Sequence, residues 1–140
     1  LFARIGIWLR SLRQYSVGIE NSRYLPASGP VVIVTNAKST QDQGDIHACC
    51  DRQVLMLDRT SDPLPAKVLA ATAALRRDDI VLVHVSYAQL GELLRQLHQS
   101  NPDVQVLPIT HHRDSKVQVI LHETVPALTS VEELQQRVTY

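Results

Sequence analysis

The sequence of 140 residues has few cysteines, few aromatic side chains and no excess of either charge. Its two cysteines, Cys49 and Cys50, are neighbours, so they cannot supply the separated ligand pairs of a structural zinc site or a framework of disulfides. Fourteen basic residues balance fourteen acidic ones, which excludes a global field that would attract nucleic acid or an anionic bilayer. The five glycines are dispersed and form no phosphate-binding loop. With 44% hydrophobic and 20% charged residues, the composition is typical of one globular domain.

Long apolar runs are also missing. Arginines interrupt the N-terminal segment every few positions, so no stretch approaches the roughly 20 apolar residues that span a bilayer. No signal-peptide pattern follows Leu1. We therefore expect a cytoplasmic domain, cut from a longer polypeptide, that has the rest of that polypeptide as a partner.

Residues 1–13 are predicted to form a short basic amphipathic helix. Apolar side chains recur there at helical spacing, and the charged residues among them are all arginines. The helix either lies on a membrane surface or a partner domain, or packs on the domain's own sheet, and both interpretations stay open. The predicted membrane or partner contacts are Arg4, Trp8, Arg10 and Arg13.

The rest of the chain alternates between short apolar runs and helical patterns. Strands are predicted at residues 15–19, 31–34, 54–57, 80–85, 104–109 and 117–121. Helices are predicted at residues 43–50, 66–76, 87–99 and 130–138, the last one opened by Ser130 with Glu133 three residues on. Continuous apolar strands joined by helices predict an α/β fold. We expect a single domain in which a mostly parallel sheet of about five or six strands has helices on both faces.

Residues 29–42 carry the most informative pattern, because an apolar strand runs directly into the polar segment N-A-K-S-T-Q-D. This resembles the first block of the glycerolipid acyltransferase family, the PlsC-type domain, in which an apolar strand precedes N-H-x-S-x-x-D. Asn36, Ser39 and Asp42 match that block. The segment before this block is similar as well. It has a basic amphipathic helix, a short strand over residues 17–21, and the pairs Leu-Pro and Gly-Pro just before the apolar strand of the block. The resemblance implies an acyltransferase-like architecture.

The chain differs from the family at the residues that carry out the family's chemistry. The family's His, oriented by the Asp, acts as a general base on an acceptor hydroxyl that attacks an acyl thioester. Ala37 stands at that position. The family's second block, P-E-G-T-R, has its best counterpart in residues 80–88, which contain neither an acid nor an arginine. An alternative alignment with residues 108–113 keeps Pro108 and Arg113 but still lacks the glutamate and the glycine.

Three functions follow from this pattern. The first is a degenerate phospholipid acyltransferase-like domain, without acyl transfer of its own, that serves a larger protein as a lipid-related binding, docking or regulatory module. The second is an active lysophospholipid or glycerol-phosphate acyltransferase, with acyl-CoA or acyl-carrier protein as donor, whose His was replaced at Ala37. The third is a Rossmann-like small-molecule-binding module. We favour decay of the site over a deliberate substitution, because the second block is lost as well.

For the matching motif residues themselves, a capped loop is favoured over catalysis, with short polar side chains satisfying the N–H groups of the helix that follows. Asp42 is predicted to cap the helix that starts near Gln43. No cofactor, metal or nucleic acid is predicted as a ligand.

The remaining histidines and cysteines are predicted to be structural or solvated. His47 and Asp51 are four residues apart on a predicted helix and are expected to be a solvated pair. His84 is expected in the core or at the edge of a strand. The adjacent His111 and His112 are placed in a polar loop, with Asp114 as the nearby acid, and Cys49 and Cys50 are expected to pack among apolar neighbours.

Overall fold

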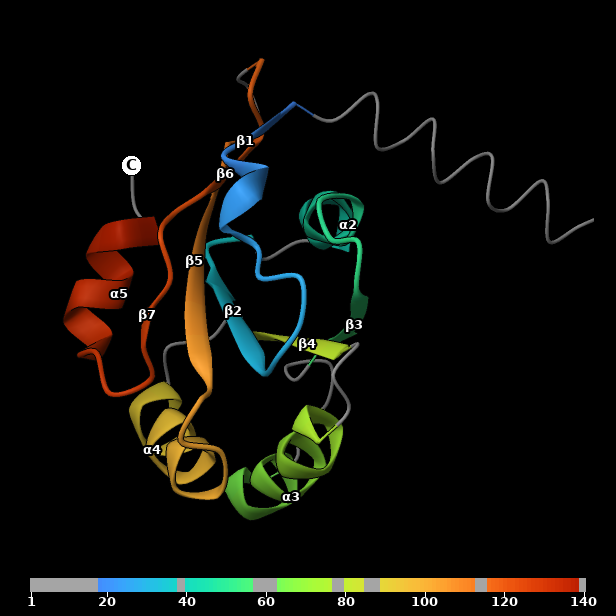
Figure 1. Ribbon diagram of the computed structural model, residues 1–140. Helices are drawn as coiled ribbons and strands as arrows, with labels where there is room; N and C mark the ends of the chain where they lie inside the picture. Colours follow the sequence, from blue (N-terminus) through green and yellow to red (C-terminus); the bar gives the residue numbers. More distant parts are fainter. Residues whose placement is uncertain are drawn as a thin grey trace, which may run out of the picture.

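A run of five β-branched residues builds the central strand of the computed structural model, β2 (Val31–Thr35). Every residue of β2 is buried, and the strand pairs in parallel with β4 (Ile80–His84) on one side and β5 (Gln105–His111) on the other. β-branched side chains suit a strand that is covered on both faces. The strand predicted at residues 31–34 is therefore confirmed, and it occupies the middle of the molecule (Figure 1).

The structure describes residues 18–37, 40–56, 63–76, 80–84, 89–112 and 116–138. The helix predicted for residues 1–13 lies outside these residues, as do its predicted contacts and Ser39 of the motif. Among the described helices, none is long and apolar enough to cross a bilayer.

The sheet is mixed. Its order is β1-β6-β5-β2-β4-β3, with β7 also paired to β5. The pairs β1/β6, β2/β4, β2/β5 and β3/β4 are parallel, whereas β5/β6 and β5/β7 are antiparallel. The remaining strands are β1 (Ile19–Glu20), β3 (Gln53–Met56), β6 (Val119–Leu121) and β7 (Val125–Pro126).

The prediction that strand and helix alternate to the end of the chain is wrong after β5. The chain returns directly into β6, because the connection between them is too short for the crossover of a dozen or more residues that a parallel neighbour needs. β7 was not predicted, since two residues are too few to show a period. The fold is thus a small single α/β domain with a mixed sheet.

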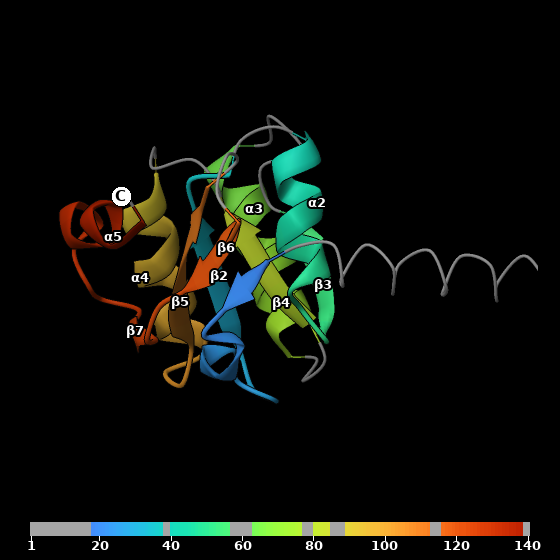
Figure 2. The ribbon, with the colours of Figure 1, turned by 90° about the horizontal axis from the view of Figure 1, so that it is seen from above.

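The α-helices of the described residues cover both faces of the sheet (Figures 1 and 2). They are α2 (Thr40–Ala48), α3 (Leu64–Leu75), α4 (Leu90–Ser100) and α5 (Val131–Val138). Val32 and Val34 of β2 pack against α3, α4 and α5 in one apolar cluster, the α3–α5 core. Val31 and Ile33 point the opposite way and pack with Ile46 of α2 in a second cluster, the α2-side core.

The predicted helices exist with shifted ends. α2 begins before the predicted residue 43, so Asp42 lies within its first turn. α4 begins after Gln89, whose backbone has a left-handed conformation with φ 64°. The predicted opening of α5 is confirmed, because the Ser130 hydroxyl accepts a hydrogen bond of 3.2 Å from the backbone N–H of Glu133.

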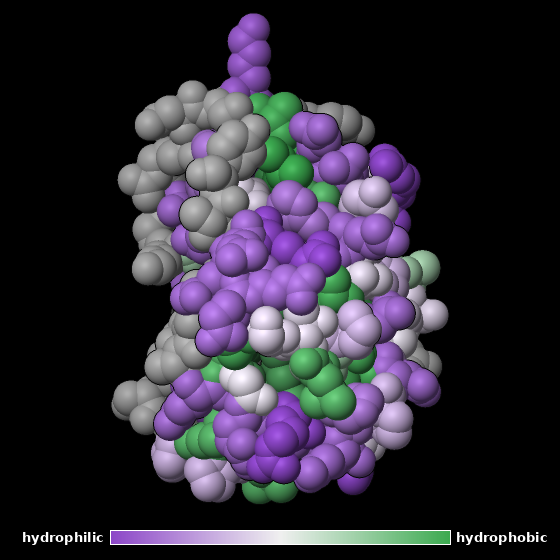
Figure 3. Space-filling model, turned by 90° about the vertical axis from the view of Figure 1, so that its left-hand side faces the viewer, coloured by the Kyte–Doolittle hydropathy of each residue, from purple (hydrophilic) through white to green (hydrophobic). Residues whose placement is uncertain are grey.

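The surface that carries α5 is mostly hydrophilic, with smaller hydrophobic areas between the polar side chains (Figure 3).

The N-terminal edge of the described chain is held through Gly18. Its backbone N–H donates to the side-chain oxygen of Gln118 at 2.7 Å, and its carbonyl accepts from the backbone N–H groups of Gln118 and Val119. A Cβ atom at position 18 would collide with the backbone carbonyl of Lys116. β1 can therefore lie beside β6 because residue 18 has no side chain.

Candidate functional site

Two adjacent parallel strands, β2 and β5, bring their carboxyl ends together at one edge of the sheet. Asn36 follows β2 directly, and His111 ends β5. The Asn36 amide donates to the carbonyl of His111 at 3.2 Å, and the backbone N–H of His111 donates to the Asn36 side-chain oxygen at 2.6 Å. This two-way contact fixes the backbone of His111 at the edge where ligands bind in α/β sheets.

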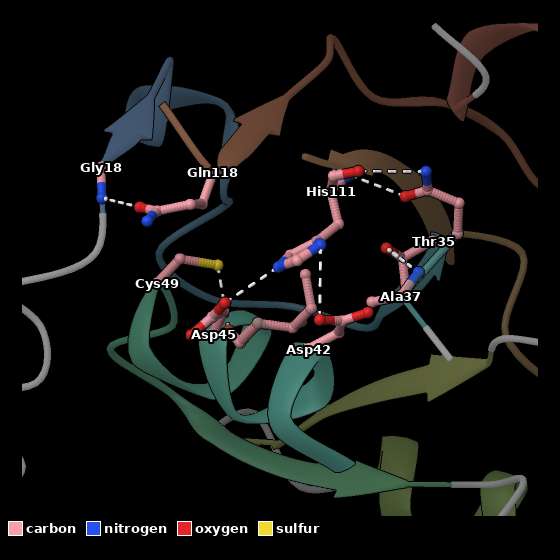
Figure 4. Close-up of polar contacts among 10 residues, drawn as sticks. Gly18, Thr35, Ala37, Asp42, Asp45, Cys49, His111 and Gln118 are labelled. Carbon is pink, nitrogen blue, oxygen red and sulfur yellow. Dashed lines mark hydrogen bonds and ion pairs between the residues drawn. The ribbon is translucent and has the colours of Figure 1, made fainter. Parts of the chain in front are cut away.

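The His111 side chain points from this edge toward α2 (Figure 4). Its Nε2 lies 2.9 Å from Oδ2 of Asp45, and its Nδ1 lies 3.8 Å from Oδ1 of Asp42. The two acids are three residues apart on α2, so they lie on the same side of the helix. The side chains of His111, Asp42 and Asp45 are 4%, 12% and 17% exposed, so the acid–histidine cluster is largely shielded from water.

The alternation of side chains along β5 explains why His111 reaches α2. Leu107 and Ile109 belong to the α2-side core, and His111 is the next residue on that face. The prediction that His111 lies in a polar loop beside Asp114 is therefore wrong: His111 continues the strand and has its acidic partners on α2.

Ala37 is fully buried and belongs to the α2-side core. Its backbone N–H donates to the Thr35 hydroxyl at 3.2 Å. The position at which the acyltransferase resemblance requires a titratable nitrogen is thus occupied by a methyl group in an apolar environment.

The structure brings together two of the predicted motif residues, Asn36 and Asp42, through their shared contact with His111. Sequence reasoning missed Asp45 and His111 as members of this site. Two signals could have indicated them: Asp45 is three residues from Asp42 along a helix, and His111 continues the alternation of a buried strand.

The acid–histidine cluster sets limits on its own chemistry. A general base needs a ring nitrogen within hydrogen-bond reach of the substrate's proton. Both ring nitrogens of His111 face carboxylates in this arrangement, and the ring is buried. The same three side chains offer one ligand atom each within 4.8 Å of one another, which makes them the group in the described part of the chain that could hold a metal ion.

The other predicted pairings do not form a second site in the described residues. α2 ends at Ala48, so Asp51 is not on the helix with His47 as predicted; both residues are exposed. His84 is the last residue of β4, in line with its predicted place in a strand.

Cys49 and Cys50 lie at the end of α2 and are buried in the α2-side core. Their sulfur atoms are 3.8 Å apart, and the Cys49 thiol donates to the carbonyl of Ile46 at 3.0 Å. The contact with Cys50 and burial together raise the pKa of the Cys49 thiol far above its usual range. Cys49 therefore stays protonated at neutral pH, which is the state of a packing residue and not of a nucleophile.

A second buried polar contact holds α5 on the opposite face. The Thr110 hydroxyl lies 2.7 Å from Nε2 of His122 and donates to the carbonyl of Arg137 at 3.3 Å. Burial, and then the positive charge of Arg137, lower the pKa of His122. His122 is therefore neutral at pH 7, and it contacts the Thr110 hydroxyl that joins β5 to the end of α5.

Comparisons with protein-family models, with curated proteins and with solved structures find no match to this chain.

Proposed function

We propose that this chain is a degenerate PlsC-type acyltransferase-like domain that serves a larger lipid-handling protein as a binding, docking or regulatory module. The observation that carries the proposal is Ala37, which is fully buried among apolar side chains at the position where the family places its base. A methyl group cannot accept a proton from an acceptor hydroxyl. The domain is therefore proposed to transfer no acyl group itself.

The neighbouring histidine does not replace the missing base. Asp42, which would orient the base in the family, is instead 3.8 Å from Nδ1 of His111, and Asp45 takes the other ring nitrogen. An acceptor hydroxyl would have to displace a carboxylate to reach His111. This arrangement supports a motif that has been kept for structure and not for acyl transfer.

The proposal includes a finer description of the fold. We propose a mostly parallel sheet of the acyltransferase-like kind with helices on both faces. The four parallel pairs, against the two antiparallel pairs that β5 makes with β6 and β7, and the apolar clusters on both faces support this description. The proposed partners are the rest of a larger polypeptide and either a membrane surface or an acyl-carrier protein. They would be contacted through residues 1–13, and the domain would be cytoplasmic and peripheral at the membrane.

An acyl-transfer assay tests the proposal. The purified chain is incubated with an acyl-CoA thioester and either glycerol phosphate or a lysophospholipid, and we expect no turnover above buffer. A missing general base removes about 10²–10⁴-fold of rate. Turnover that is abolished in Asp42→Asn would contradict the proposal.

A gain-of-function variant separates the two acyltransferase interpretations. Ala37→His returns the base to the motif, with Ala37→Ser as a matched control that adds a small polar group without a base. We expect both variants to stay inactive, because the core leaves little room at position 37 and residues 80–88 contain no phosphate-binding arginine. Robust activity in Ala37→His alone would show that the active-enzyme alternative is correct.

A further inference from the structure

We infer that Asp42, Asp45 and His111 form a binding site for one divalent transition-metal cation, with zinc as the preferred ion. The site goes beyond the proposed function and does not depend on it. Its three donors converge from two elements that are far apart in the sequence, α2 and the carboxyl end of β5.

The donor atoms lie close to the positions that one cation requires. Zinc binds histidine nitrogen and carboxylate oxygen at about 2.0–2.2 Å, so two ligands of a tetrahedral ion lie about 3.4 Å apart. His111 Nε2 and Asp45 Oδ2 are 2.9 Å apart, and the three ligand atoms of the cluster lie within 4.8 Å of one another. An imidazole binds one ion through one nitrogen, so the Asp42 carboxylate, which faces Nδ1 at 3.8 Å, turns toward the ion held by Nε2 and Asp45. Side-chain adjustments of about 1–1.5 Å complete the set.

The backbone contact of Asn36 prepares His111 for this role. Its amide holds both the N–H and the carbonyl of His111, and the imidazole is 96% buried and directed at the two acids. A ligand whose position is fixed in advance loses little conformational freedom on binding.

The donor set selects the class of ion. Magnesium and calcium prefer oxygen ligands alone, whereas imidazole suits zinc and its neighbours in the first transition row. Two carboxylates and one imidazole are three protein ligands, which leaves a fourth position open for water or a small exogenous ligand.

Isothermal titration calorimetry of the EDTA-treated protein tests the site with zinc chloride and, separately, with magnesium chloride. We expect one zinc ion per chain and an affinity for magnesium lower by at least about 100-fold. His111→Gln and Asp45→Asn each remove one ligand and should weaken zinc binding by at least about 10- to 100-fold. His47→Gln is the matched control, because it removes an exposed imidazole from the same helix outside the cluster.

Circular dichroism establishes that each variant is folded. If His111→Gln does not fold, the zinc affinity of Asp45→Asn tests the site, because this variant keeps the imidazole and the shape of the acid. The inference is overturned by the absence of saturable zinc binding, by zinc binding that both variants retain, or by an equal loss in His47→Gln. None of these outcomes bears on the acyl-transfer assay, so the site and the proposed function fail or stand separately.

Discussion

The two faces of the sheet are covered in different ways. On one face, α4 buries Leu90, Leu93, Leu94 and Leu97 at 1% exposure or less. On the other face, α2 has one large apolar residue, Ile46, and places Asp42 and Asp45 against His111. α4 is held by hydrophobic burial, whereas α2 depends in part on polar contacts with the end of β5. The face with the weaker apolar cover is thus the face that carries the candidate site.

Truncation of a leucine in the α3–α5 core should have the largest effect. We expect Leu94→Ala to lower the free energy of unfolding by about 2–5 kcal/mol, because it removes buried methyl groups and leaves a cavity. Chemical denaturation measures the loss. Leu69→Ala is the control, since Leu69 is 75% exposed on α3 and its truncation should cost less than about 0.5 kcal/mol. Equal effects of the two variants would contradict a core held by α4.

Loss of the histidine in the acid–histidine cluster should have the next largest effect. We expect His111→Leu to cost about 1.5–3 kcal/mol, because two largely buried carboxylates lose the imidazole that they contact. Urea unfolding in the presence of EDTA checks this value. The double variant Asp45→Asn/His111→Leu should recover part of the loss, since it removes one of the charges left behind. A double variant that is less stable than His111→Leu would show that α2 is not held in this way.

The α5 face should respond to pH through His122. The pKa of His122 is lowered in the folded protein, so between about 6.5 and that lower pKa the unfolded chain binds more protons. The free energy of unfolding should therefore fall as the pH drops below about 6.5, with a slope of at most about 1.4 kcal/mol per pH unit from this group. His122→Asn, measured at the same pH values, should have a flatter dependence. An unchanged slope would assign the pH response to other groups.

Exposed ion pairs should matter least on either face. Arg95 on α4 contacts Glu92, and Arg137 on α5 contacts Glu133 at 2.9 Å, all on solvent-exposed surfaces. Solvent and salt screen such pairs. Thermal unfolding of Arg95→Gln should be indistinguishable from that of the parent chain. A clear decrease in its midpoint would mean that the cover by α4 is not purely apolar.

Sequence patterns were sufficient where a segment's own residues decide its structure. The β-branched run of β2, the leucine spacing of α4 and the cap at Ser130 each predict their element. Continuous apolar strands between helical segments also predict the α/β class. In these places the periodicity of burial within one segment contains the necessary information.

Only the tertiary structure decided the direction of β6, the existence of β7 and the composition of the candidate site. The pairing of His111 with Asp45 joins residues 66 positions apart, and that of Asn36 with His111 joins residues 75 positions apart. A local pattern reports which side of a segment is buried, but it does not report which distant segment covers that side. Asp42 therefore looked like a helix cap in the sequence, and its histidine partner became visible only when β5 was placed beside β2.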